Sequence, residues 1–262
     1  MELTGHNVAH QLTPYLKQLR LSGILATLEA RNRQAIDGKW TYVDFLSRLL
    51  QDEVERRAQK QLALRLRRGT INTNKTLERF DFDFNPALNR QQILQLASCD
   101  YIRRKRNVLI CGPTGVGKSH MAHALAHEAC RQGFAVLFVN THKMLQHLHG
   151  GRADGSLERR FQTYLRPDLL ILDDFGLKPL RSPAPEDLYD VINERYERGS
   201  ILLTSNRAPN EWPELLGDPL MASAGLDRLA HQAEIVIITG SSFRAQDRRR
   251  LEQEVLTEPS RV

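Results

Sequence analysis

Cysteine and long apolar runs are what this sequence has least of. Its 262 residues include only three cysteines, Cys99, Cys111 and Cys130, which cannot all pair, and Cys111 falls in an expected core strand. We therefore expect reduced thiols in a cytoplasmic protein rather than a disulfide framework. No apolar run approaches the ~20 residues that cross a bilayer. The first residues also lack the basic-then-apolar order of a signal peptide, so neither membrane insertion nor secretion is expected.

The sequence also lacks the patterns of several other protein classes. It shows no Ser-His-Asp or Cys-His arrangement, no internal repeat and no low-complexity tract. His120, His123 and His127 would share one helical face, a spacing that can suit a metal. Because no cysteine or carboxylate cluster joins them, we expect packing and surface roles for these side chains rather than a zinc site.

Positive charge is present in excess at one end of the chain. Residues 1–75 hold 13 Lys and Arg against 7 Asp and Glu, whereas residues 76–262 hold 24 of each. The formal excess of +6 therefore lies in the N-terminal quarter. A basic segment attached to a neutral one favours a polyanionic partner, most often nucleic acid. A solvated basic surface without a partner is the alternative at this point.

A glycine-rich motif at residues 112–119 fits the pattern G-x-x-x-x-G-K-[ST] of a phosphate-binding loop, or P-loop. Its glycines let consecutive N–H groups turn inward and cradle phosphate oxygens. Its lysine supplies a positive charge for the β- and γ-phosphates, and its last hydroxyl is a ligand for Mg²⁺. The motif therefore predicts a nucleoside triphosphate with Mg²⁺. The residues concerned are Gly112, Pro113, Thr114, Gly115, Val116, Gly117, Lys118 and Ser119.

The surroundings of this motif are those that a P-loop requires, a buried strand before it and a helix after it. Residues 107–111 form a short apolar run of strand length. After the motif, apolar residues recur at helical spacing from 121 to 129, and Gly133 is a suitable helix end. Residues 135–139 form the next expected strand. This order makes a chance match of the motif a poor explanation.

Polar residues follow two further apolar strands. Residues 169–172 run into Asp173 and Asp174, a Walker B pattern. In that pattern Asp173 would hold Mg²⁺ through its water shell, and Asp174 would polarise the attacking water. Residues 201–204 run towards Asn206, which would contact the γ-phosphate or that water. Turn geometry is the alternative reason for an asparagine at this position.

The order of elements predicts an α/β core preceded by a smaller domain. Strands and helices alternate over residues 76–245, which indicates a parallel sheet between helices. Residues 1–75 show only helical spacing, with a helix end at Gly69 and a polar, linker-like stretch over 70–76. We therefore expect an all-α N-terminal domain that binds DNA or a partner. Residues 246–262 are expected to form a charged C-terminal tail.

Two arginines near the C-terminus are further candidates. Arg228 lies between Leu226 and Leu229 on an expected helix, and Arg244 follows Phe243. The spacing leaves open whether these are surface ion-pair residues or groups that reach the nucleotide of a neighbouring subunit.

Together these residues resemble the AAA+ ATPases, and more narrowly the IstB-like helper ATPases of bacterial insertion sequences, which are similar to the DnaC-type helicase loaders. The resemblance covers nearly the whole chain, including a helical N-terminal region of similar length. It rests on residues 76–82, 107–108, 117–120, 168–174, 195–198, 203–206, 211–212, 227–229 and 240–244.

The resemblance implies an AAA+ core without the usual helical lid domain. It implies that ATP drives self-assembly of a homo-oligomer on double-stranded DNA, and that this assembly recruits and stimulates a transposase in a bacterial cytoplasm. Arg228 would be an arginine finger acting in trans, and Arg244 would lie near the nucleotide or the subunit interface. His120 would belong to the ATP-binding residues. The catalytic set would comprise Lys118, Asp173, Asp174, Asn206 and Arg228.

One position departs from the AAA+ pattern. Position 174 carries Asp where these proteins usually carry Glu, and the shorter side chain would position water less well. We therefore expect slow ATP hydrolysis that depends on DNA and on oligomer formation. A turnover rate with DNA that matched fast AAA+ motors would contradict this expectation.

Three other functions stay open from the sequence. A DnaC-like helicase loader would have a helicase rather than a transposase as its partner, and would need a docking segment for it in the N-terminal domain. A small-molecule P-loop kinase would need a lid and an acceptor pocket, but neither Asn206 nor an interfacial Arg228. An ATP-gated scaffold on DNA would hydrolyse ATP only to disassemble.

Overall fold

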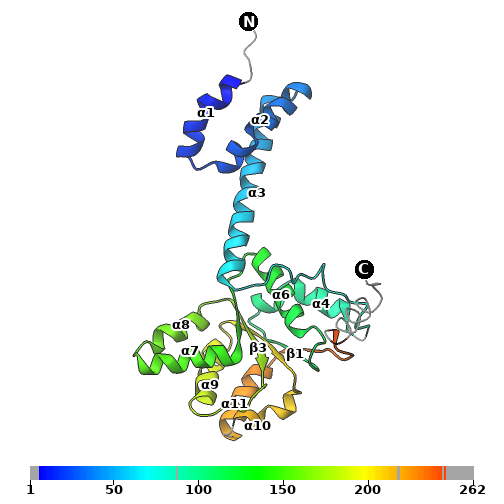
Figure 1. The fold of residues 1–262 in the computed structure, drawn as a ribbon, viewed down its shortest axis with the longest axis vertical. Helices are drawn as coiled ribbons and strands as arrows, with labels where there is room; N and C mark the ends of the chain where they lie inside the picture. The colour runs from blue at the N-terminus through cyan, green and yellow to red at the C-terminus, as the bar shows by residue number, and fades with distance from the viewer. Residues whose placement is uncertain (1–5, 87, 217–218, 244, 246–262) are drawn as a thin grey trace, which may run out of the picture. The chain divides into compact units, whose positions relative to one another are not determined.

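The computed structural model describes residues 6–86, 88–216, 219–243 and 245 (Figure 1). Two compact units divide between Leu64 and Arg65, whereas the sequence suggested a boundary after Lys75. The expected charged tail at 246–262 lies outside the described residues. No helix in the described part of the chain is both long and apolar enough to span a membrane.

The first unit consists of helices, as the periodicity predicts. They are α1 (His6–Gln18), α2 (Ser22–Asp37) and α3 (Tyr42–Arg68), and the last of these continues past the unit boundary. Ile24, Leu28 and Leu49 form a small buried cluster. Several other apolar side chains of α3 are exposed, so they do not contribute to this core. The exposed members are Val43, Leu46, Leu50 and Val54.

A buried carboxylate fixes the start of α2. Glu53 on α3 is 4% exposed, and its Oε2 accepts hydrogen bonds from the N–H groups of Gly23 (2.5 Å) and Ile24 (3.3 Å). These donors have no partner within the helix, because the first turn of a helix leaves its N–H groups unpaired. A Cβ on Gly23 would lie 2.6 Å from Glu53 Cα, so the glycine is what permits this close approach.

The second unit contains a five-stranded, all-parallel sheet in the order β2-β3-β4-β1-β5. This confirms the α/β fold class. The three central strands, β3, β4 and β1, are buried on both faces, as expected for a parallel sheet between helices, whereas the edge strands β2 and β5 are only partly buried. The strands are β1 (Val108–Cys111), β2 (Val136–Asn140), β3 (Leu169–Phe175), β4 (Ser200–Ser205) and β5 (Glu234–Ile237).

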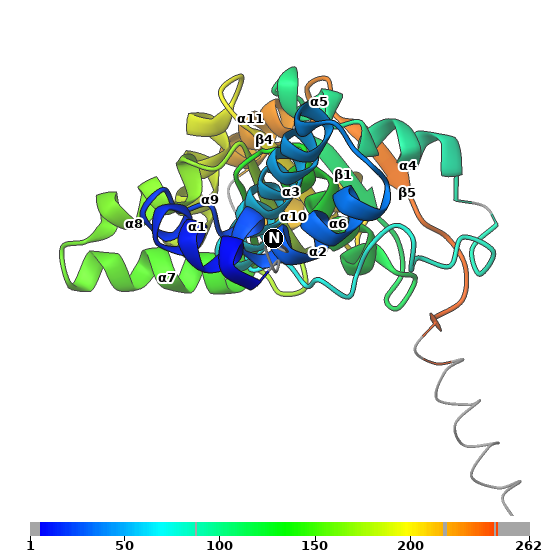
Figure 2. The ribbon, with the colours of Figure 1, turned by 90° about the horizontal axis from the view of Figure 1, so that it is seen from above.

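Helices cover both faces of this sheet. On one face α6 (Lys118–Arg131) packs on the strands, with α4 (Arg90–Ala97) beside it. The other face carries α7 (Thr141–Ala153), α8 (Leu157–Leu165), α9 (Ala184–Arg195) and α11 (Pro219–Ala230). Figure 2 shows α7 and α8 side by side at one flank and α4 with β5 at the other. Three short helices complete the unit, α5 (Asp100–Arg103), η1 (Pro209–Glu211) and α10 (Pro213–Leu216).

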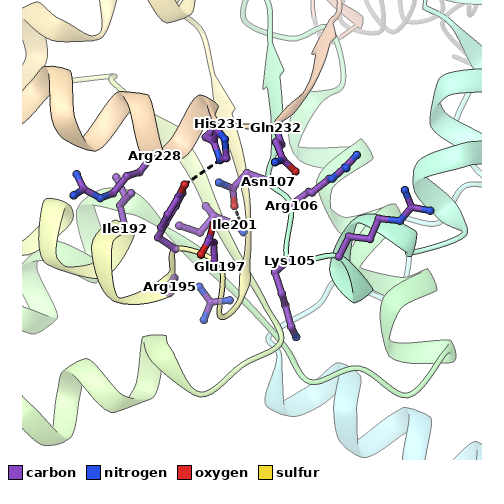
Figure 3. Close-up of a pocket in the computed structure, with 12 residues that line it drawn as sticks. Lys105, Arg106, Asn107, Ile192, Arg195, Glu197, Ile201, Arg228, His231 and Gln232 are labelled. Carbon is purple, nitrogen blue, oxygen red and sulfur yellow. Dashed lines mark hydrogen bonds between the residues drawn. The ribbon is translucent and has the colours of Figure 1, made fainter.

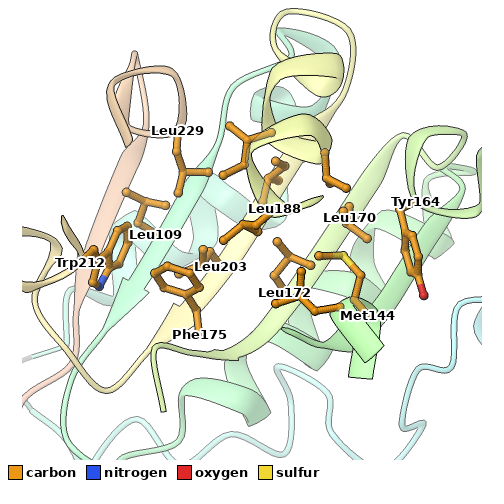
Figure 4. Close-up of a cluster of buried hydrophobic side chains, with 14 of the residues drawn as sticks. Leu109, Met144, Tyr164, Leu170, Leu172, Phe175, Leu188, Leu203, Trp212 and Leu229 are labelled. Carbon is orange, nitrogen blue, oxygen red and sulfur yellow. The ribbon is translucent and has the colours of Figure 1, made fainter. Parts of the chain in front are cut away.

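The main core lies between the sheet and the helices α7, α8, α9 and α11 (Figure 4). Alternate residues of the strands point into it, which is the period of two that a strand imposes. Leu109, Leu172 and Leu203 come from three neighbouring strands, and the rings of Phe175 and Trp212 meet edge to face with centroids 5.0 Å apart. This core holds the carboxyl ends of β1, β3 and β4 in fixed register.

The stretch expected to be a polar linker is packed against β2 instead. Helix α3 ends at Arg68, and Thr70, with a φ of +55°, rather than Gly69 takes the left-handed conformation. Phe138 N–H donates to Gly69 O (2.9 Å), and Thr70 Oγ1 donates to Phe138 O (2.5 Å). A Cβ on Gly69 would lie 2.6 Å from Val136 O. Glycine is therefore required here for close approach to an edge strand.

Candidate functional site

The P-loop joins β1 to α6, which is the context that the sequence predicts. Gly112, Gly115 and Gly117 have φ values of +155°, +88° and +98°. Lys118 begins α6, and its side-chain Nζ donates to Gly112 O (2.7 Å) and Pro113 O (2.6 Å). Phosphate oxygens are stronger acceptors than these carbonyls. The N-terminus of α6 also favours an anion at this position, because its N–H groups and dipole point towards it.

Two segments brace the P-loop from outside. Phe243 N–H donates to Gly115 O (3.0 Å), and the buried Asn85 donates from Nδ2 to Val116 O (3.0 Å). A Cβ on Gly115 would lie 2.1 Å from Ser242 Oγ. The loop is therefore held by the chain before α4 and by the chain after β5. Neither contact could be read from the motif.

Hydrogen bonds connect the P-loop to the Walker B strand. Ser119 Oγ donates to Asp173 Oδ1 (2.9 Å), and Thr204 Oγ1 donates to the same oxygen (2.5 Å). Ser119 and Asp173, predicted as the Mg²⁺ residues, thus lie next to each other. A hydroxyl and a carboxylate beside a phosphate-binding loop are the oxygen ligands that Mg²⁺ takes in nucleotide sites. The donor set therefore fits this ion.

Asp174 occupies a β-bulge. Leu172 pairs with Leu203 and Phe175 pairs with Ser205, so Asp173 and Asp174 together oppose the single residue Thr204. Asp174 takes a φ of +58°, and its N–H donates to Thr204 Oγ1 (3.1 Å). A bulge redirects side chains that a regular strand would send to opposite faces. Here Asp174 lines the pocket above the P-loop while Asp173 reaches Ser119.

Asn140, at the carboxyl end of β2, holds the side chain of Asp174. Its Nδ2 donates to Asp174 Oδ2 (3.1 Å), and its Oδ1 accepts from the N–H groups of His142 (3.1 Å) and Lys143 (3.4 Å). The cap on α7 therefore sets the orientation of the amide. Asn140 was not among the predicted site residues, although, like Asn206, it stands at the end of an apolar strand next to the Walker B strand.

A pocket of about 460 Å³ lies over the P-loop. Asp174 and Asn206 both line it, so the structure places these two predicted residues at the same site as the loop. Its other wall, which includes three phenylalanines and two basic residues, was not predicted from the sequence. Phe80 packs edge to face on His120 (centroids 5.3 Å), and Phe84 packs in the same way on Phe243 (5.0 Å). The wall consists of Asn74, Lys75, Arg79, Phe80, Asp81, Phe84, Asn85 and Phe243.

Two histidines of α6, His120 and His123, pack on other aromatic rings, and His120 also lines the pocket over the P-loop. His120 Nε2 lies 3.2 Å from Thr76 O, and burial lowers the pKa of this ring. The ring of His123 stacks on Phe138 (3.7 Å), and its Nδ1 accepts from the N–H of Asn72 (3.3 Å). No group of three His, Cys, Asp or Glu side chains in the described residues is placed to hold a metal ion.

Arg228 lies away from the P-loop of its own chain. It borders a second pocket, of about 260 Å³, where β1 and β4 begin (Figure 3). Its Nη1 donates to Ala224 O (3.0 Å), its guanidinium lies 5.6 Å from the ring centroid of Tyr189, and it points outward from Asn107. The structure therefore does not bring Arg228 together with Lys118 or Asp173 within one chain. Arg244 lies outside the described residues.

Local structure accounts for the basic lining of this second pocket. Lys105, Glu197 and Gln232, with φ between +54° and +58°, follow the ends of α5, α9 and α11, so three helix C-termini meet here. Cations are favoured at helix C-termini. Arg195, 1% exposed, donates to five carbonyls, and burial lowers its pKa to about 10. This pocket therefore needs no anionic ligand to explain its charge.

The sheet order, the P-loop and the adjoining Walker B residues define a P-loop NTPase core of the AAA+ class. The chain belongs to the family described as IstB-like ATP binding protein, which matches residues 14–251.

Curated relatives agree with this assignment, and a solved structure shares the fold. The chain is 40% identical over 234 residues to an ATP-binding protein in an insertion sequence of Mycobacterium tuberculosis, covering 89% of this chain and 93% of the relative. It is 35% identical over 241 residues to the ATP-binding protein of insertion sequence IS21 from Pseudomonas aeruginosa, covering 92% and 91%. The replication initiator DnaA, solved with AMPPCP and single-stranded DNA, superposes with a TM-score of 0.54 at 21% identity, covering 73% of this chain and 58% of DnaA. This last likeness shows the fold.

Proposed function

We propose that this chain is an ATP-dependent, DNA-binding AAA+ regulator of transposition, which assembles on duplex DNA and recruits and stimulates a transposase. The observation that carries the proposal is the hydrogen bond between Ser119 and Asp173, which joins the P-loop to the Walker B strand (2.9 Å). The relatives that are named as ATP-binding proteins of insertion sequences support the biological setting.

In this proposal, each residue of the site has its own part in ATP hydrolysis. Lys118 exchanges its two loop carbonyls for β- and γ-phosphate oxygens. Ser119 and Asp173 would hold Mg²⁺, which would supply positive charge against the phosphate charge that develops in the transition state. Asp174 accepts a proton from the attacking water, and Asn206 orients that water or the γ-phosphate from the neighbouring strand.

The placement of Arg228 supports a site that two subunits share. Since it borders a different pocket from the P-loop, it cannot serve the nucleotide of its own chain without a large rearrangement. If the surface around Arg228 of one copy packed against the P-loop of a second copy, Arg228 would place a positive charge at the γ-phosphate bound by that second copy. Such head-to-tail contacts generate rings or filaments.

Mixing two inactive variants tests this sharing. Lys118→Ala should lose nucleotide binding, whereas Arg228→Ala should keep it and lose turnover by ~10³-fold or more. An equal mixture of the two variants is assayed for phosphate release with duplex DNA. About a quarter of its interfaces should be active, because there the intact P-loop of an Arg228→Ala subunit meets the intact Arg228 of a Lys118→Ala subunit. The matched control mixes Lys118→Ala with Asp173→Asn, two changes on the same side of the interface, and should regain nothing. Absence of rescue in the first mixture would contradict the shared site.

The identity of the partner needs a separate assay. With ATP and duplex DNA, the chain should stimulate strand transfer by the transposase of the same insertion sequence. Stimulated loading of a replicative helicase, with no effect on strand transfer, would favour the helicase-loader function instead.

A further inference from the structure

One buried hydroxyl contacts both residues of the Walker B pair. Thr204, on β4, is completely buried. Its Oγ1 donates to Asp173 Oδ1 (2.5 Å) and accepts from the N–H of Asp174 (3.1 Å). A threonine hydroxyl has one proton to donate and two lone pairs. The first contact directs that proton to the carboxylate, and the second uses a lone pair for the backbone.

These contacts coincide with an irregularity in the sheet. Thr204 is the single β4 residue that faces both Asp173 and Asp174 across the bulge. On its other side it pairs with Ile110 of β1, so its backbone lies in the centre of the sheet. The positive φ of Asp174 costs free energy unless its surroundings hold it in place. The Thr204 hydroxyl is one of the groups that do so.

We propose that Thr204 is a positioning residue for ATP hydrolysis. Its hydroxyl orients Asp173 and Asp174 so that the two adjacent carboxylates have different tasks. Through Asp173 Oδ1 it holds the carboxylate that accepts from Ser119 and would bind Mg²⁺, and through the Asp174 N–H it holds the bulge that places Asp174 in the pocket. The assignment rests on the proposed ATPase function. The alternative is that Thr204 only fills a buried position in the sheet.

Three substitutions separate these roles. Thr204→Val replaces the hydroxyl by a methyl of similar size, Thr204→Ala removes it without adding a group, and Thr204→Ser keeps it. The probe is methylanthraniloyl-ADP, titrated with Mg²⁺ and followed by fluorescence, together with ATP turnover on duplex DNA. Loss of a side chain that orients a metal ligand typically weakens metal affinity or activity by 10–100-fold.

We expect Thr204→Val and Thr204→Ala to raise the half-saturating Mg²⁺ concentration and to lower kcat, each by about 10–100-fold. Nucleotide binding without Mg²⁺ should stay near wild type, and Thr204→Ser should retain both properties. In an Asp173→Asn background, Thr204→Val should not change the Mg²⁺ dependence further, since the carboxylate through which it acts is gone.

Wild-type Mg²⁺ dependence in a folded Thr204→Val or Thr204→Ala variant would overturn the proposal. So would an equal loss in Thr204→Ser, which would implicate packing. If neither hydroxyl-free variant folded, the hydroxyl would be a requirement of the sheet, and the positioning role would be rejected. A wild-type chain without turnover would refute the ATPase function, while the Mg²⁺ titration would still decide the role of Thr204.

Discussion

At the scale of single residues, the site separates two carboxylates that are neighbours in sequence. Asp173 accepts hydroxyl donors from Ser119 and Thr204, whereas Asp174 accepts the amide of Asn140. The left-handed backbone at Asp174 gives a physical reason for the residue type there. Among residues other than glycine, Asn and Asp are the types that visit this conformation most often, so Asp is a better fit than the longer Glu.

Asn replacements at these two positions should have different effects. Asp174→Asn tolerates the same backbone and should leave Mg²⁺-dependent nucleotide binding intact, while turnover falls by ~10²–10⁴-fold, since the general base is lost. Asp173→Asn should weaken the Mg²⁺-dependent part of binding as well. Titration with a fluorescent nucleotide, beside phosphate release, measures both. Equal loss of binding in the two variants would contradict the division of tasks.

At the scale of elements, β1, the P-loop and α6 could be predicted because each depends on a local pattern. The four strands β1 to β4 begin within one residue of the apolar runs that predict them. The bulge at Asp174, the brace on Gly115 and the aromatic wall could not, because each depends on partners distant in sequence. Helices α4 and α5 were also not predicted from the sequence. The stretch after Gly69 reads as a linker, yet it lies along β2, because that contact is made by backbone groups and by Thr70.

The packing of α6 against β2 and this stretch should depend on pH. Burial, followed by the nearby charge of Lys75, lowers the pKa of His123 to about 4 from an ordinary value of 6.5. Because the folded state favours the neutral ring, its stabilisation is complete above pH 6.5 and is lost as the pH falls through 6.5 towards 4. Protonation would also remove the acceptor for the Asn72 N–H.

His123→Asn keeps an acceptor and cannot titrate, so it isolates this effect. Its melting temperature should be well below that of the wild type at pH 7.5, and the gap should narrow as the pH is lowered to 5. Thermal unfolding followed by circular dichroism measures the gap. A constant gap across this range would show that His123 contributes only through stacking on Phe138.

At the scale of the whole molecule, the structure relocates the positive charge. The first 75 residues carry an excess of +6, but residues 1–64, the first compact unit, hold 9 Lys and Arg against 7 Asp and Glu. The remaining excess of +4 comes from Arg65, Arg67, Arg68 and Lys75, with no acidic residue between them. Within the first 75 residues, most of the excess positive charge therefore lies at the end of α3 and in the stretch that follows, rather than in the first unit.

DNA binding should follow that charge. Each phosphate contact contributes about −0.9 to the slope of log affinity against log salt concentration. Replacing Arg67 and Arg68, both exposed, by Gln should reduce the magnitude of the slope by up to about 1.8 and weaken binding to all sequences. Arg33→Gln with Arg56→Gln, two exposed positions of the first unit, is the matched control and should change the slope less. Fluorescence anisotropy with a labelled duplex measures the slopes, and equal changes would refute this localisation.

The stretch from Gly69 to Asn85 carries a thermodynamic consequence. It continues directly from the basic end of α3, and Asn74, Lys75 and Phe80 within it line the pocket over the P-loop. A polyanion bound at its start and a nucleotide bound at its end would both restrict the same length of backbone. If both ligands favour the same arrangement of this stretch, then by reciprocity the factor by which ATP tightens DNA binding must equal the factor by which DNA tightens ATP binding.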